Sequence, residues 1–464
     1  MLDKGIIQKL EAIVGKKNLL LEKVDLVTYS YDATANVPRT LPDVIVMPVT
    51  TDHVQQIIKI AAAEKIPVYP RGAGTNLSGG CNPLKKGIVL SFQHMNKILE
   101  IDTENLTATV QPGVVIQDLN NDVTAHGLIY PPDPGTVATA TMGGSVAENS
   151  GGLRGLKYGV TKHYVMGMEV VMSDGDRFRF GGKTVKNVTA YEFQSLFVGS
   201  EGTLGIITEI TVKLIPAPKY KKSMMGLFKT IEDAGNTVAG IIKAKVIPAT
   251  LEIMDKKTIE TVENYAKVGL PLDVAALLLI EVDGMSQEVV DLETQAVIKV
   301  IEENKGELKI ANSDAERDNL WAARRAALPA LAQLNNTVII EDATVPRSRI
   351  TDMLVACGEI GERNNVTLGT FGHAGDGNLH PTILFDSNDK AETARVHKAV
   401  DEIFAAALSL GGTLSGEHGI GIAKMKYLEN ELGRSGLEVM RKLKAALDPN
   451  NILNPAKMVP CAEV

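Results

Sequence analysis

The apolar positions of the first 218 residues follow strand spacing and helix spacing in turn. Residues 43–49 (DVIVMPV) predict a buried strand, and residues 50–65 carry apolar side chains at helical spacing, with Thr51 and Asp52 as candidate caps. Shorter elements follow: strands at 66–70, 87–92 and 108–113, a helix at 115–127, and a β-branched strand with a Pro-rich stop at 202–218. This order predicts a mixed α+β domain that ends near residue 218.

The pattern restarts near residue 220. A strand at 222–229 leads to a helix at 231–244, and a strand at 274–284 leads to a helix at 286–305. Strand–helix repeats of this kind are typical of a ferredoxin-like sheet, so we expect a second domain with its own sheet. The last segment, residues 436–459, predicts a helix and then a tail rich in Pro and Asn.

Length and charge narrow the class of protein. A chain of 464 residues suits two or three domains, and 44% hydrophobic residues are typical of a folded globular protein. The net charge is −8 and no basic stripe is present, so a nucleic-acid partner is not expected. No apolar run reaches about 18 residues, the length that a membrane-spanning helix needs. The first twenty residues predict an amphipathic helix rather than a signal peptide.

The three cysteines, Cys81, Cys357 and Cys461, are far apart in the sequence. Such spacing favours neither a disulfide framework nor a cysteine-bound iron–sulfur cluster. It predicts a cytoplasmic protein that passes any electrons to another molecule.

Three tracts rich in Gly, Ser and Thr lie in the first half, at 71–80, 131–159 and 199–208. None is a strand–GxGxxG–helix unit with an acid about 20 residues later, so a nicotinamide site of the usual kind is not supported. Backbone N–H groups of residues 71–80 (RGAGTNLSGG) can bind a pyrophosphate, although such loops are more often plain turns. Three tracts in one domain favour a long, flat cofactor that lies against the backbone.

Three of the eight histidines lie in two short segments of the second half. His373 and His380 flank Gly375 and Gly377, which predicts a strand, a turn and a strand rather than a helix. With Glu417 they form a two-His, one-carboxylate set that suits Zn²⁺, Fe²⁺ or Mn²⁺. The alternative is that the histidines cap turns and Glu417 is solvated. Neighbours in an extended chain point to opposite sides, so Glu417 and His418 should have different roles.

These segments resemble the vanillyl-alcohol oxidase/p-cresol methylhydroxylase superfamily. The resemblance is closest to its branch of glycolate oxidase catalytic subunits, D-lactate dehydrogenases and D-2-hydroxyglutarate dehydrogenases, and it covers nearly the whole chain. It implies an α+β fold with a two-part FAD-binding domain at 1–218, a ferredoxin-like substrate (cap) domain with the metal site at 219–432, and a C-terminal segment at 433–464 that returns to the flavin.

The resemblance also implies an FAD site built from the glycine-rich tracts and the tail. Many relatives attach the flavin through a histidine in the first loop, and Thr75 stands at that place, which implies non-covalent FAD. Lys457 is a further implied contact in the tail. The implied cofactor-binding residues are Pro70, Arg71, Gly72, Ala73, Gly74, Thr75, Asn76, Gly79, Gly80, Pro134, Gly135, Thr136, Gly143, Gly144, Ser145, Asn149, Ser150, Gly151, Gly152, Glu201, Gly202, Gly205, Ile206, Ile207 and Asn454.

For the second half, the resemblance implies that His373, His380 and Glu417 bind a divalent metal and that His418 is the catalytic base. The segment 318–330 (DNLWAARRAALPA) resembles a Leu-Trp-x-x-Arg motif, which places Arg324 on the substrate carboxylate, with Arg325 as the alternative one residue away. A hydride would then pass from the substrate to flavin N5.

The expected reaction is therefore the oxidation of a small D-2-hydroxy acid, D-lactate first and glycolate next. No clear Lys or Thr pair for a second carboxylate is present, which makes D-2-hydroxyglutarate a weaker candidate. The expected electron acceptor is a separate protein, such as an electron-transferring flavoprotein or an iron–sulfur subunit. Two competing hypotheses are a non-catalytic FAD subunit of a larger redox complex and an Fe²⁺-dependent oxygenase; the latter would leave the glycine-rich tracts unexplained.

Overall fold

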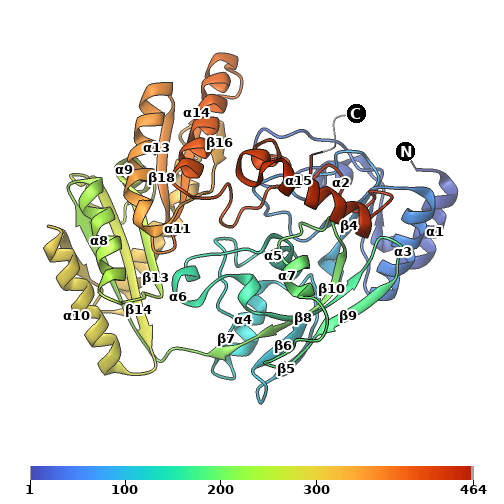
Figure 1. Cartoon of the computed structure of the whole chain (residues 1–464), viewed down its shortest axis with the longest axis horizontal. Coiled ribbons are helices and arrows are strands. Elements are labelled where there is room, and N and C mark those ends of the chain that lie inside the picture. The colour runs from blue at the N-terminus through green and yellow to red at the C-terminus, as the bar shows by residue number, and fades with distance from the viewer. Residues whose placement is uncertain (1, 461–464) are drawn as a thin grey trace. The chain divides into compact units, whose positions relative to one another are not determined.

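The computed structural model describes residues 2–460, so Cys461 lies outside the described residues. The chain divides into two compact units. Unit 1 comprises Met1–Gly151, Val160–Ala217 and Glu417–Val464, and unit 2 comprises Gly152–Gly159 and Pro218–Gly416. Figure 1 labels the elements of both.

Unit 1 begins with a four-stranded sheet in the order β1-β2-β4-β3. Its strands are β1 (Leu19–Leu20), β2 (Val44–Val46), β3 (Val68–Arg71) and β4 (Ile88–Ser91), of which the last three are parallel. Helix α3 (Thr51–Glu64) connects β2 to β3 and buries Val54, Ile57 and Ile58 in the same core. Helix α1 (Lys4–Val14) contacts α3 and adds Leu10.

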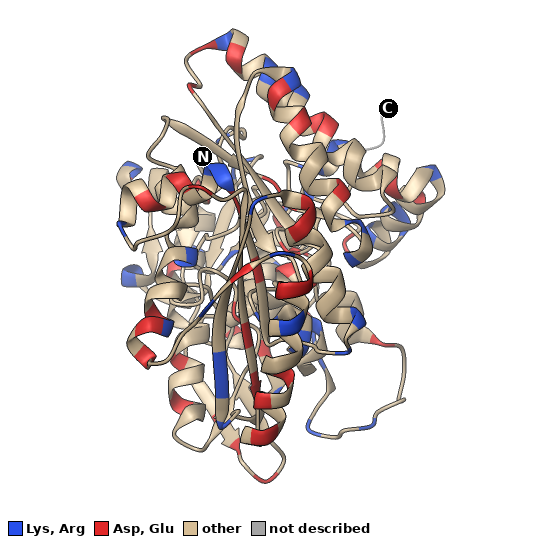
Figure 2. Cartoon of the chain, turned by 90° about the vertical axis from the view of Figure 1, so that its left-hand side faces the viewer, with Lys and Arg blue, Asp and Glu red and all other residues tan. Residues whose placement is uncertain are grey.

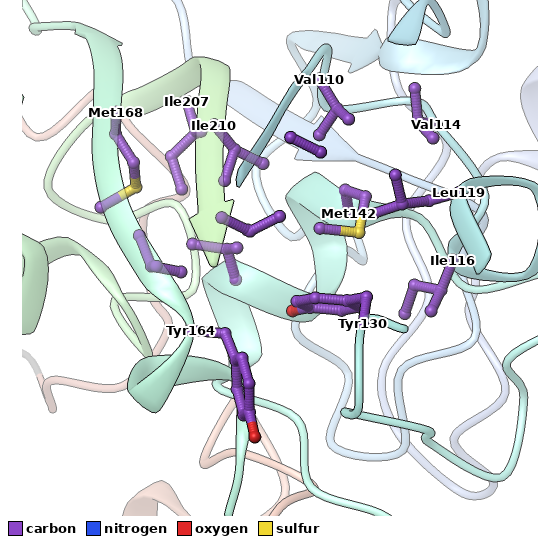
Figure 3. Close-up of a cluster of buried hydrophobic side chains, with 14 of the residues drawn as sticks. Val110, Val114, Ile116, Leu119, Tyr130, Met142, Tyr164, Met168, Ile207 and Ile210 are labelled. Atoms are coloured by element: carbon purple, nitrogen blue, oxygen red, sulfur yellow. The ribbon is translucent and has the colours of Figure 1, made fainter. Parts of the chain in front are cut away.

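The second sheet of unit 1 is antiparallel and has the order β5-β6-β10-β8-β9. Its strands are β5 (Ile98–Asp102), β6 (Thr107–Val110), β8 (Val165–Val171), β9 (Arg177–Gly181) and β10 (Ile206–Lys213). Apolar side chains of this sheet pack against α4 (Ile116–Thr124) and α5 (Met142–Glu148), as Figure 3 shows for Met142, Ile207 and Ile210. Each such buried side chain contributes about 1.5–3 kcal/mol to stability, which fixes α5 on the sheet.

The C-terminal stretch belongs to unit 1. Helix α15 (Leu428–Leu447) is kinked at Gly433, whose φ is +67°. After the helix, Ile452 and Leu453 enter the core of the first sheet, and the N–H of Val68 donates to the carbonyl of Ile452 at 2.7 Å. Residues 452–454 therefore lie beside β3. Unit 1 also contains α2 (Lys23–Thr28), α7 (Phe193–Phe197), β7 (Leu128–Ile129) and β11 (Ile215–Pro216).

Unit 2 is built on an eight-stranded antiparallel sheet, in which β15-β12-β14-β13-β18-β19-β16 are adjacent in that order and β17 also pairs with β19. The strands are β12 (Tyr220–Phe228), β13 (Thr250–Asp255), β14 (Ala276–Gly284), β15 (Glu307–Ile310), β16 (Thr337–Ile340), β17 (Ala343–Thr344), β18 (Thr367–His373) and β19 (Asn378–Phe385).

Helices cover both faces of this sheet (Figure 1). Met225 and Leu227 face a core shared with α9 (Lys256–Ala266), α11 (Asp314–Arg325) and α12 (Ala327–Leu331). Phe228 lies on the opposite side, beside Ile301 of helix α10 (Gln287–Glu303). The helices that contact one another on that side are α8 (Ile231–Lys243), α10 (Gln287–Glu303), α13 (Ile350–Asn364) and α14 (Lys390–Ser409).

Unit 2 also takes in the short helix α6 (Gly155–Tyr158), which lies near the end of the second glycine-rich tract. Lys157 Nζ and the Tyr158 hydroxyl each donate to the carboxylate of Asp283 on β14, at 2.6 and 2.8 Å. These two bonds attach the segment 152–159 to the sheet of unit 2.

The predicted mixed α and β fold is confirmed, and so is the strand–helix order of the second half. One detail is wrong: Thr50, rather than Thr51 or Asp52, is the cap of α3. Its backbone is extended and its hydroxyl accepts the N–H of His53 at 3.2 Å, so the helix already begins at Thr51. No helix among residues 2–460 is long and apolar enough to cross a membrane. In the view of Figure 2, acidic and basic residues are interspersed over the described chain.

Candidate active site

The loop 72–80 leaves the carboxyl end of β3 and has two halves with different hydrogen bonding. In the second half, Asn76 Oδ1 accepts the N–H groups of Ser78 at 2.8 Å and Gly80 at 2.7 Å, and Thr34 accepts that of Gly79 at 2.7 Å. Within the described residues, the N–H groups of residues 73–77 have no such hydrogen bond. Free N–H groups in a glycine-rich loop are what a bound pyrophosphate requires, so this loop fits the phosphates of FAD.

Two glycines, one in this loop and one at the start of α5, lie where a side chain would clash with its neighbours. A Cβ at Gly72 would lie 2.3 Å from Thr141 Oγ1, and one at Gly143 would lie 2.5 Å from Cβ of Pro112. Gly74 has a φ of +75°, which L-residues with a side chain rarely adopt. Glycine is therefore required at 72 and 143 by close packing and at 74 by the backbone conformation of the loop.

Three hydroxyl groups near the end of α5, from Ser145 in the helix, Ser150 after it and Thr161 in a later turn, bond to one another. Ser145 Oγ contacts Ser150 Oγ and lies 3.0 Å from Thr161 Oγ1. Asn149, at φ +57°, ends the helix, and its side-chain oxygen accepts the N–H of Lys162 at 2.9 Å. Ser145, Asn149 and Ser150, which the sequence predicts as FAD contacts, thus share one small polar cluster of unit 1.

The third tract, 199–208, lies beside the first two. Gly199 and Glu201 donate their N–H groups to Val146 and Ala147 of α5, at 2.9 and 2.8 Å. A Cβ at Gly202, whose φ is +67°, would lie 2.4 Å from Pro70 Cγ. The first and third glycine-rich tracts and the part of the second up to Gly151 therefore belong to unit 1 and pack against one another, as a shared cofactor site requires.

Glu201 joins this tract to the segment that begins at Glu417. Its buried carboxylate accepts the N–H groups of Ile420 at 2.6 Å and Gly421 at 2.8 Å. Burial raises the pKa of Glu201, although these two N–H groups lower it. A Cβ at Gly151 would lie 2.8 Å from Glu417 Oε2, so the Glu417 carboxylate lies against the predicted flavin tract. His418 is buried in the same segment.

The tail holds two of these loops together. Asn454 Nδ2 donates to the carbonyls of Gly80 at 2.8 Å and Glu201 at 2.6 Å, and Lys457 Nζ donates to the carbonyl of Asn82 at 2.5 Å. Both side chains are buried. Burial lowers the pKa of Lys457 to about 8, while nearby acidic groups oppose this shift. Both residues therefore donate to protein backbone, which positions the loops.

In unit 2, the strands β18 and β19 bring His373 and His380 together. His373 pairs with Asn378 across the two strands, and His380 lies two residues further along β19, so all three share one face of the sheet. The two buried rings are nearly perpendicular, with centroids 5.1 Å apart, and one ring nitrogen of each lies within 4.8 Å of the other. The predicted strand, turn and strand is confirmed, and the pair suits a divalent metal in donor type and spacing.

Glu252 of β13 connects His373 to Arg324. Its Oε1 lies 2.7 Å from His373 Nδ1, and its Oε2 accepts a hydrogen bond from Arg324 Nε at 2.6 Å. Burial alone would raise the pKa of Glu252, but the charges and hydrogen bonds of His373 and Arg324 hold it below its ordinary value. Sequence reasoning missed Glu252, because it lies in a plain strand segment, 121 residues from His373.

The two candidate arginines differ in their surroundings. Arg324 is buried on α11, and its guanidinium carbon lies 4.7 Å from the centre of the Phe371 ring. Arg325 is exposed and reaches the carbonyl of Asp318 at 3.5 Å. A second carboxylate, Asp342, accepts the hydroxyl of Ser415 at 2.6 Å and lies 4.0 Å from His380 Nδ1. The buried set of unit 2 thus contains Arg324, the two histidines and two carboxylates.

Residues 42–181 match the family model of an FAD binding domain, and residues 217–458 match that of the C-terminal domain of FAD linked oxidases. The chain belongs to the FAD-linked oxidase family. The predicted flavoprotein class is thereby confirmed, as is FAD as its cofactor.

The sequences of two relatives align with this FAD-linked oxidase over nearly their full lengths. Glycolate oxidase subunit GlcD of Bacillus subtilis is 50% identical over 463 residues, which cover 99% of this chain and 97% of the relative. A D-lactate dehydrogenase of Anaerostipes hadrus is 37% identical, covering 98% and 97%. Among solved structures, p-cresol methylhydroxylase with substrate bound has the same fold, with a TM-score of 0.82, 20% identity and coverage of 99% of this chain and 98% of that one.

Proposed function

We propose that this FAD-linked oxidase oxidises a small D-2-hydroxy acid, with D-lactate and glycolate as the candidate substrates, to the 2-oxo acid. The observation that carries the proposal is the buried bond between Arg324 and Glu252, beside the pair of His373 and His380. An arginine suits a substrate carboxylate, and a histidine pair suits a metal that binds a hydroxyl. The names of the two curated relatives, glycolate oxidase subunit and D-lactate dehydrogenase, support the same substrate class.

Each proposed role follows from the chemistry of the side chain. Arg324 would grip the carboxylate through two parallel N–H bonds. His373, His380 and Glu417 would hold the divalent metal, which would orient the hydroxyl and lower its pKa. His418 would take the hydroxyl proton, because an imidazole with an ordinary pKa of about 6.5 accepts protons near neutrality. FAD supplies the acceptor for the hydride, and the glycine-rich tracts of unit 1, with the residues predicted from the sequence, would bind it.

The electrons would leave to a separate protein, such as an electron-transferring flavoprotein or an iron–sulfur subunit. The sequence has three widely separated cysteines and no cluster motif to receive them. The relative with 50% identity is itself named a subunit, which supports a partner chain. Co-purification of a second redox protein with the natively expressed enzyme tests this part.

The replacement His418→Ala tests the proposed mechanism. We expect FAD to stay bound and reduction of the flavin by substrate to slow about a hundredfold or more, because proton removal loses its base. Anaerobic stopped-flow absorbance measures the reduction rate. His126→Ala, at an exposed position, is the matched control and should keep the wild-type rate. A His418→Ala enzyme that is reduced as fast as the wild type would exclude this residue as the base.

A further inference from the structure

Glu252 occupies a place where a carboxylate is costly unless both of its oxygens are bonded. It lies in the middle of β13, which pairs with β14 on one side and β18 on the other, and only 1% of it is exposed. One oxygen bonds to His373 and the other to Arg324. A buried carboxylate has to be paired or hydrogen-bonded, and the partners of this one are the two side chains that the proposed function assigns to metal and substrate.

The first bond determines which nitrogen of His373 is available. An ionised carboxylate only accepts hydrogen bonds, so His373 Nδ1 must carry the proton in the contact of 2.7 Å. In the neutral ring, Nε2 then has the lone pair that a metal ion needs. A carboxylate in this position also fixes the orientation of the ring and makes Nε2 a better metal ligand.

The second bond determines how Arg324 can bind an anion. Glu252 takes Nε, at 2.6 Å, and the ring of Phe371 lies against the guanidinium group. The two terminal nitrogens of the guanidinium are then left to bind a carboxylate through two bonds. Without Glu252, the same group could rotate and offer a different pair of donors.

We propose that Glu252 is a positioning residue that fixes the metal-binding tautomer of His373 and the carboxylate-binding orientation of Arg324 at the same time. This inference rests on the proposed function for the identity of the two ligands. It predicts that one substitution weakens metal binding and substrate binding together, although Glu252 itself touches neither.

The test compares Glu252→Gln and Glu252→Asp with the control Glu281→Gln in the FAD-loaded protein. Glu281 is a carboxylate of the neighbouring strand β14 that accepts the hydroxyl of Ser223 at 2.6 Å, a bond that glutamine can also accept. A glutamine at 252 has one acceptor oxygen for two donors. We expect the dissociation constant for Zn²⁺, measured by calorimetry on metal-depleted protein, to rise about 10- to 100-fold. The KM for D-lactate or glycolate should rise in the same variant, Glu252→Asp should be intermediate, and Glu281→Gln should stay near the wild type.

A measurement on the wild type covers the case in which Glu252→Gln fails to fold. In ¹⁵N-histidine spectra of the metal-depleted, FAD-loaded protein, the His373 signal, assigned from its loss in His373→Gln, should show Nδ1 protonated and Nε2 unprotonated. The opposite tautomer would overturn the inference, as would a folded Glu252→Gln protein with unchanged Zn²⁺ affinity and KM. If the wild type binds no metal and no 2-hydroxy acid reduces its flavin, the proposed function fails. The tautomer of His373 is measured independently of that result, so it still tests whether Glu252 positions the ring.

Discussion

The side-chain amide of Asn454 donates a hydrogen bond to the carbonyl of Gly80, 374 residues earlier in the chain, at 2.8 Å. A second N–H of the same amide bonds the carbonyl of Glu201 at 2.6 Å. One side chain of the tail therefore holds two of the three glycine-rich tracts, and the geometry of the proposed FAD site depends on a residue of the C-terminal segment.

Replacing this side chain should loosen FAD. Asn454→Ala leaves two buried carbonyls without a donor, each at a cost of about 1–3 kcal/mol. We expect a lower melting temperature and a clearly weaker affinity for FAD, measured by the flavin released on dilution. Asn451→Ala is the matched control, since Asn451 also has a positive φ, of 49°, but is exposed. Equal FAD retention in the two variants would contradict the role of Asn454.

The flavin should be bound without a covalent bond. The resemblance to the superfamily places Thr75 at the loop position where many members carry a linking histidine, and a hydroxyl cannot form that link in the same way. Acid precipitation should therefore leave all of the yellow colour in the supernatant. Flavin that remains in the washed precipitate would show that another residue is attached to it.

The buried Lys457 predicts a dependence of stability on pH. Its pKa is about 8 in the folded protein, against about 10.4 in an unfolded chain. Between these values the unfolded state binds the extra proton, so a rise in pH favours the folded state by about 1.4 kcal/mol per pH unit. Below pH 8, Lys457 is protonated in both the folded and the unfolded state, so its contribution to the free energy of unfolding no longer changes with pH.

This dependence is measured as the free energy of unfolding of the wild type minus that of Lys457→Met, from denaturant titrations at pH 7.5 to 10 in excess FAD. The difference should be constant near pH 7.5 and rise above pH 8. Lys17→Met, which removes an exposed lysine, serves as the control for the loss of a surface charge. A difference that stays constant to pH 10 would show that Lys457 is not perturbed by burial.

The two neighbouring arginines should respond differently to the same substitution. Arg324→Lys replaces a two-point fork by a single ammonium group, so we expect the KM for the hydroxy acid to rise about 10- to 100-fold, which corresponds to about 1.4–2.8 kcal/mol. Arg325→Lys, at an exposed position, should change the KM less than twofold, on the order of experimental scatter. Steady-state kinetics measure the KM of both variants. A larger rise in KM for Arg325→Lys than for Arg324→Lys would show that Arg325, and not Arg324, binds the substrate carboxylate.

Local pattern is enough to predict much of this structure. The apolar spacing of α3 and the glycines between His373 and His380 are local signals, and both the helix and the strand pair are found. The predicted cap of α3 is wrong by one residue, because Thr50, Thr51 and Asp52 are all suitable cap residues and only the backbone conformation distinguishes them.

Long-range contacts cannot be predicted in the same way. Glu252 lies in a strand segment, LEIMD, where alternation alone would suggest a carboxylate that faces solvent. Its burial depends on β14 and β18 on both sides and on the arrival of Arg324 from α11. The bonds of Asn454 to Gly80 and Glu201 are equally remote in sequence, so no window of the chain contains both partners.

The central claim is tested most directly by anaerobic absorbance spectra of the purified yellow protein after addition of D-lactate, glycolate, L-lactate or D-2-hydroxyglutarate, with and without a chelator. We predict that D-lactate or glycolate bleaches the visible flavin band within seconds, that L-lactate and D-2-hydroxyglutarate do so far more slowly, and that removal of the metal suppresses the reaction until Zn²⁺, Fe²⁺ or Mn²⁺ is restored. Flavin that stays oxidised with every 2-hydroxy acid, in protein with both FAD and metal bound, would contradict this claim.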